Sequence, residues 1–199
     1  MAITKQIVSC QIRSAQVGAF PFTATSSDTA VLQSLTSGTY SAIVTGANSS
    51  TGAALVEIYD ADPTGATSRL VNLSARGMVG TGSSIMTGGF VISGNTTETV
   101  LIRAVGPTLA MYNVTGALAQ PSLTVYDSTG KSVASNTVWG GGSTLSTAMT
   151  QVGAFALPST SADSAVLVTL PAGAYTVQVS GVNGTTGNAL VEIYEVSSP

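Results

Sequence analysis

Apolar and polar residues alternate with a period of two in short runs along this chain. In residues 174–181, Tyr175, Val177 and Val179 alternate with polar side chains, and residues 189–196 follow the same pattern. A period of two with one polar face predicts a strand that is buried on one side. The loop at residues 182–187 is rich in Gly, Asn and Thr, so the two runs predict a β-hairpin.

This pattern occurs twice, because residues 16–60 match residues 151–195 without a gap. Tyr40 falls on Tyr175 and Tyr59 on Tyr194. Each copy is expected to form a strand followed by a hairpin, and so a three-stranded antiparallel unit. The expected strands are 29–35, 39–45 and 53–59 in the first copy and 164–170, 174–181 and 189–196 in the second.

Only the second copy follows a long stretch of further strand-like runs, separated by Gly and Pro. The runs are residues 70–76, 85–93, 99–105, 123–127 and, after a turn at 127–130, 132–135. Residues 107–112 and 144–151 are expected to form short helical segments, the second capped by Ser143 or Thr144. Many short strands predict an all-β protein of antiparallel β-sandwich or jelly-roll lobes. One complete repeat (residues 69–199) would follow a half repeat (16–68) and a strand-like segment (1–15).

The motifs LVNLSARG, GGFVISG, VLIRAVGPTL and LVEIYE carry a resemblance. They resemble a tandem β-sandwich repeat domain found near the C-termini of large bacterial surface and secreted proteins. The resemblance covers residues 69–196 as a whole unit and residues 16–61 as the second half of another. The stretch from LTVYDSTG onward is also similar to small jelly-roll domains of secreted peptidases. The resemblance implies an extracellular β-sandwich module without catalytic residues.

Composition excludes several function classes. The 199 residues include no His, 8% are charged, and the net charge is −3 with six scattered basic residues. Scattered basic residues argue against nucleic acid as a partner. Without His the chain lacks the usual neutral-pH base and the commonest metal ligand. Cys10 is the single cysteine, and no apolar run is long enough to predict a membrane span.

The acidic and basic candidates favour structural roles, so we predict no catalytic, cofactor-binding or metal-ligating residue. Glu57 and Glu192 occupy equivalent strand positions, which does not suit a glycosidase carboxylate pair. Lys131 follows a tight turn, where a solvated charge is expected. Arg76 and Arg103 lie within strand-like runs and are expected to pair with a carboxylate or with backbone carbonyls.

Two further motifs have a functional and a structural interpretation. Asp60, Asp62 and Gly65 could supply oxygen ligands to calcium, although the sequence is also that of an ordinary turn. Trp139 stands beside three glycines and could stack on a sugar ring, but a Trp that plugs the end of a sandwich is the favoured interpretation.

The incomplete half repeat suggests that the chain assembles with a partner. Three strands cannot cover both faces of a sandwich, so the half repeat needs partners from outside itself. The N-terminal segment offers a candidate subunit interface in Ile3, Ile7, Val8 and Ile12. We therefore expect a non-enzymatic extracellular structural subunit that self-assembles through β-strand contacts into a filament or surface array. The alternative is a carbohydrate-binding module that meets a glycan surface. The expected partner is a homo-oligomer or polymer of the chain itself.

Overall fold

The computed structural model describes residues 15–23, 25–63, 66 and 68–196. The chain divides into two compact units, Met1–Leu70 and Val71–Pro199. The repeat-based borders at residues 16 and 69 stay predictions.

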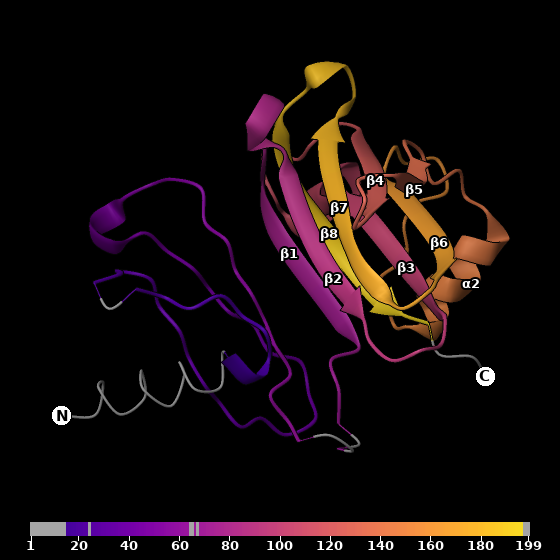
Figure 1. Ribbon diagram of the computed structural model, residues 1–199. Helices are drawn as coiled ribbons and strands as arrows, with labels where there is room; N and C mark the ends of the chain where they lie inside the picture. The colour runs from indigo at the N-terminus through magenta and orange to yellow at the C-terminus, as the bar shows by residue number, and fades with distance from the viewer. Residues whose placement is uncertain (1–14, 24, 64–65, 67, 197–199) are drawn as a thin grey trace. The chain divides into compact units, whose positions relative to one another are not determined.

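The second unit is a β-sandwich of two antiparallel four-stranded sheets (Figure 1). The first sheet has the order β1 (Asn72–Val79), β8 (Gly187–Glu195), β3 (Glu98–Val105), β6 (Ser164–Leu170). The second has the order β2 (Met86–Ile92), β7 (Gly173–Gly181), β4 (Pro121–Asp127), β5 (Ser132–Asn136). The expected all-β sandwich is confirmed.

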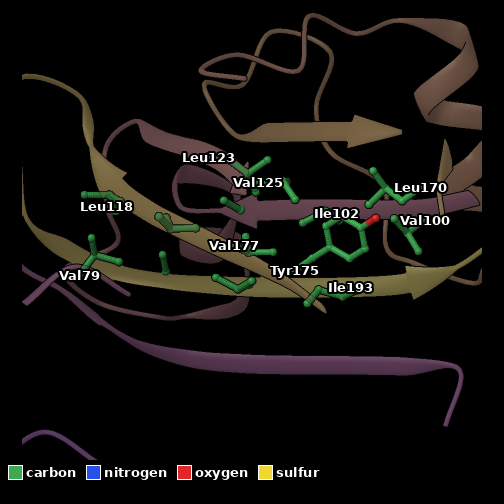
Figure 2. Close-up of a cluster of buried hydrophobic side chains, with 14 of the residues drawn as sticks. Val79, Val100, Ile102, Leu118, Leu123, Val125, Leu170, Tyr175, Val177 and Ile193 are labelled. Atoms are coloured by element: carbon green, nitrogen blue, oxygen red, sulfur yellow. The ribbon is translucent and has the colours of Figure 1, made fainter. Parts of the chain in front are cut away.

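A hydrophobic core fills the space between the sheets, because alternate residues of each strand point inward. Tyr175 and Val177 of β7 face Ile193 of β8 in this core, and all three are buried. Figure 2 shows the Tyr175 ring close to Ile102 and Ile193. The Tyr175 hydroxyl donates to the Pro171 carbonyl at 2.9 Å, so its polar atom is satisfied.

A second apolar cluster covers the outer face of the first sheet. The helix α2 (Ser143–Gln151) and the 3₁₀ segment η3 (Pro107–Tyr112) pack there against β3 and β6 (Figure 1). The strand β3 is therefore buried on both faces. The N-cap of α2 is Gly142, without a side-chain cap, so the expected capping by Ser143 or Thr144 is wrong. The backbone C=O of Gly142 still begins the helix by accepting the N–H of Ser146.

The strands expected in residues 70–196 are all present, but the pairing expected in the second copy is wrong, both the hairpin and the three-stranded unit. β7 and β8 do not form a hairpin: β7 pairs with β2 and β4, and β8 with β1 and β3. The 3₁₀ turn η4 (Val182–Gly184) carries the chain from one sheet to the other. Both strands bury one face in the same core, so they pack face to face. Alternation predicts one buried face in either arrangement, which is why the sequence did not distinguish them.

The first unit departs further from expectation. Its described residues from 15 to 70 contain no strand, so the predicted strands 29–35, 39–45 and 53–59 are wrong, as is the three-stranded unit. The reason lies in the topology of the complete repeat. β6, β7 and β8 pair only with β1, β2, β3 and β4, never with one another. Strand backbone needs neighbours for its N–H and C=O groups, and the described residues of the first unit include none of the equivalent neighbours.

The first half is residues 71–136, which contain β1–β5, and the second half is residues 151–195, which contain β6–β8. The half-repeat is residues 16–60, the sequence copy of the second half.

Candidate functional site

An arginine buried within the second unit joins the two halves of the repeat. Arg103 of β3 is fully buried and lies opposite Glu192 of β8 in register. Its Nε donates to Glu192 Oε2 at 2.8 Å, its Nη2 donates to the same oxygen, and its Nη1 donates to the Phe155 carbonyl at 2.6 Å. The guanidinium carbon lies 4.3 Å from the centre of the Phe155 ring. The first half therefore supplies the cation. The second half supplies the carboxylate, the carbonyl and the aromatic ring that contact it.

Tyr194 completes this cluster. Its hydroxyl donates to Glu192 Oε1 at 2.6 Å, so both carboxylate oxygens are engaged. Burial raises the pKa of the Tyr194 phenol above its usual 10.0, and the bond to Glu192 raises it further. The expectation that Arg103 pairs with a carboxylate or with a carbonyl is confirmed for both groups, whereas Arg76 is exposed on β1.

A buried aspartate forms the second polar link between the halves. Asp163 of the second half is fully buried, and its Oδ1 accepts the backbone N–H of Gly106 at 2.7 Å and of Thr108 at 3.4 Å. Its Oδ2 accepts the Thr108 hydroxyl and, at 2.6 Å, the Ser161 hydroxyl. These N–H groups begin η3, where a carboxylate satisfies donors that have no partner within the helix.

Trp139 lies beside Asp163 in the apolar cluster on the outer face of the first sheet. It is 6% exposed, and its indole N–H donates to the Pro158 carbonyl at 3.0 Å. Its backbone N–H donates to the Asp163 carbonyl at 2.8 Å. The indole is therefore buried, but it does not plug the end of the sandwich as expected, and its faces are not available to stack on a sugar.

The remaining acidic candidates shape turns. Asp62 N–H donates to Asp60 Oδ1 at 2.9 Å, and the Ser68 hydroxyl donates to Asp62 Oδ2 at 2.7 Å, while Gly65 lies outside the described residues. In the β4–β5 turn, Asp127 Oδ1 accepts the Thr129 hydroxyl at 2.6 Å and the Lys131 N–H at 3.0 Å. The Thr129 bond, followed by the Lys131 bond, lowers the pKa of Asp127. The described residues contain no cluster of three or more His, Cys, Asp or Glu side chains.

The half-repeat keeps the local structure of the second half. Tyr40 donates to the Thr36 carbonyl at 2.8 Å, as Tyr175 does to Pro171. Tyr59 donates to Glu57 at 3.1 Å, and Ser26 donates to Asp28, repeating the bonds Tyr194–Glu192 and Ser161–Asp163. The turn η1 (Ala47–Ser49) repeats η4, with Asn48 at φ 52° and Asn183 at φ 56°.

The two copies differ in what covers them. Val56 is 53% exposed where Val191 is 3% exposed, and Ile58 is 51% exposed where Ile193 is 7% exposed. Glu57 and Asp28 are exposed as well, whereas Glu192 and Asp163 are buried against Arg103 and the start of η3. The exposed surface of the half-repeat is the candidate functional site.

The half-repeat also keeps the residues that are buried in the second half. Among the positions buried there, only three differ in the half-repeat: Phe22, Thr29 and Ala42 stand for Leu157, Ser164 and Val177. Asp28, Ser26 and Phe20 were not predicted from the sequence as part of such a surface. The feature that could have identified these three residues is that each is identical to its counterpart in the second half. The predicted interface residues Ile3, Ile7, Val8 and Ile12 lie outside the described residues, so that prediction stays untested.

Comparisons with known proteins find likenesses among solved structures. No protein-family model and no curated protein matches the chain. A solved structure, the pre-peptidase C-terminal domain of a collagenase from Bacillus anthracis, is similar at 10% sequence identity and a TM-score of 0.38. The alignment covers 62% of this chain and 89% of that one. Among the described residues, no helix has the length and apolar character needed to cross a membrane.

Proposed function

We propose that this chain is a non-enzymatic, extracellular structural subunit that assembles through β-strand contacts into a filament or surface array. One observation carries the proposal: the half-repeat exposes the apolar side chains whose counterparts form the core of the second unit. Val44 is 60% exposed and Leu35 58%, besides Val56 and Ile58. A row of exposed apolar side chains that spans a whole half-domain marks an interaction surface.

The energetics of burial support this proposal. Covering a Val, Leu or Ile side chain stabilises a complex by about 1.5–3 kcal/mol. Unpaired backbone along residues 53–59 can also gain main-chain hydrogen bonds from an added strand, which gives affinity while alternate side chains give specificity. The ordering of backbone opposes this gain by about 1–2 kcal/mol per residue, so side-chain burial and hydrogen bonding have to act together.

The buried acids support a non-enzymatic role. A general acid or base has to reach a substrate proton. Glu192 and Asp163 instead hold Arg103 and the start of η3 in closed hydrogen-bond networks. Hydrolysis of a glycan or peptide by the pure protein would overturn this part of the proposal.

The alternative of a carbohydrate-binding module ranks second. Strongly exposed aromatic rings are Phe20, Tyr40, Tyr59 and Tyr112. The first three belong to the half-repeat, and their counterparts in the second half pack inside the second unit or against Arg103. Their exposure is therefore explained by the uncovered interface. Tyr112 alone offers a ring for a sugar, and it leans on Phe155 with ring centres 5.0 Å apart.

Electron microscopy and sedimentation of the purified chain test the assembly. We expect ordered polymers that are lost when Val56 and Ile58 are both replaced by Ser. Val91→Ser is the matched control, because Val91 is 73% exposed in the second unit, outside the half-repeat. Deleting residues 2–12 tests separately whether the N-terminal segment contributes. A wild-type chain that stays monomeric at high concentration would contradict the proposal.

A further inference from the structure

The half-repeat carries enough detail to identify the kind of surface that covers it. In the second unit, β8 buries Val191 and Ile193 between the sheets, while Glu192 points to the opposite face, where Arg103 meets it. The half-repeat keeps these residues as Val56, Ile58 and Glu57. A partner that matches them has to cover both faces of the segment and pair with both of its edges.

The polar residues restrict the partner more than the apolar ones. A carboxylate buried without a cation is strongly unfavourable. A partner that buries Glu57 therefore has to supply a guanidinium. A partner that buries Asp28 has to supply two backbone N–H donors like those of Gly106 and Thr108. An apolar sheet face or a lipid surface would supply neither. Two half-repeats packed together would not supply them either, because each would bring a second carboxylate.

We infer that the half-repeat binds the first half of another repeat of the same type. That partner is a β1–β5 set with an arginine at the place of Arg103. Its arginine would bind Glu57 and the ring of Phe20, and the start of its η3 segment would bind Asp28. The inference deepens the proposed function and rests on it, since it names the partner of the same surface.

An extended chain tests the inference directly. A second copy of residues 69–150 is inserted between Ala15 and Gln16, so that the half-repeat follows a first half as residue 151 does in the native chain. Hydrogen exchange of the amides at residues 54–59 is measured by mass spectrometry in both chains. We expect these amides to exchange at least about a hundredfold more slowly in the extended chain, close to those of residues 189–194.

A glycine substitution provides a matched control. A Cβ on Gly187 would lie 2.8 Å from the Leu118 Cα, whereas a Cβ on Gly52 would meet nothing within 4 Å. Gly52→Ala should therefore leave the native chain unchanged, but it should remove the protection in the extended chain, where an inserted Leu118 would oppose it. Glu57→Ala should behave in the same way, because its arginine exists only in the extended chain.

Unprotected residues 54–59 in the extended chain, with residues 189–194 still protected, would overturn the inference. So would protection that Gly52→Ala leaves intact, since the half-repeat would then bind in another way. A second extended chain, with a Gly-Ser linker before Gln16, keeps the test valid if the first junction prevents folding. The exchange measurement reads pairing within one molecule, so it can fail while the native chain still polymerises, and it can succeed when no polymer forms.

Discussion

Replacing Glu192 by Gln should destabilise the second unit far more than the same change at Glu57. Arg103 is fully buried, and Glu192 is the acid that holds its Nε and Nη2. Gln keeps the size of the side chain but removes the charge, so the guanidinium would stay buried without a counter-ion. Breaking a buried ion pair from one side costs about 3–5 kcal/mol. Glu57 is exposed, and Glu57→Gln should change the free energy of unfolding by less than about 0.5 kcal/mol.

Urea unfolding followed by tryptophan fluorescence measures this difference. Trp139 is the only tryptophan, and it is buried in the second unit, so its emission reports the unfolding of the sandwich. With a slope of about 2 kcal/mol per molar urea, the midpoint of Glu192→Gln should fall by about 1.5–2.5 M. The double variant Arg103→Met with Glu192→Met should recover part of the loss, because it leaves no buried charge.

Two results would refute this reasoning. A Glu192→Gln midpoint within about 0.5 M of wild type would mean that the ion pair contributes little to the stability of the sandwich. An equal loss in Glu57→Gln would mean that Glu57 contributes as much as Glu192 to the stability of the sandwich, contrary to its exposed position.

Three further outcomes are expected. Gly187→Ala should destabilise the second unit by about 1–3 kcal/mol in urea unfolding, because the added Cβ meets Leu118, whereas Gly52→Ala should have no effect. Hydrogen bonds lower the pKa of Asp127, so its contribution to stability is present above pH 3.8 and is lost as the pH falls through the pKa of the folded state. In a plot of urea midpoint against pH, Asp127→Asn should therefore reduce the fall of the midpoint at acid pH. Burial raises the pKa of Tyr194, so its contribution to stability is present below pH 10.0 and is lost as the pH rises through the pKa of the folded state. Tyr194→Phe should therefore reduce the fall of the urea midpoint at alkaline pH in the same plot.

Much of the second unit was predictable because its signals are local. Alternation located β6 at Ser164–Leu170 to the residue, and the Pro at position 107 marked the start of η3. The turn at 127–130 forms as expected, with the Gly130 N–H donating to the Asp127 carbonyl. Local sequence also built the half-repeat's turn at Ala47–Ser49 and its Tyr40 bond without a sheet around them.

Partner choice was not predictable in the same way. The sequence suggested a carboxylate or carbonyl for Arg103, but Glu192 lies far away in the chain and meets it only through the register of β3 and β8. Asp163 showed no motif, because its donors are backbone N–H groups that become aligned when η3 forms.

The half-repeat distinguishes local structure from partner choice, because nearly the same sequence occurs once with the first half of a repeat around it and once without. Its residues alone determine the turns, the tyrosine bonds and the alternation of side chains, all of which need only near neighbours. Whether those residues become strands depends on β1, β2, β3 and β4. Each strand of the second half pairs with one or two of these four strands. A strand is completed by hydrogen bonds to another segment, so only the tertiary structure decides whether the same residues form a sandwich or an exposed surface.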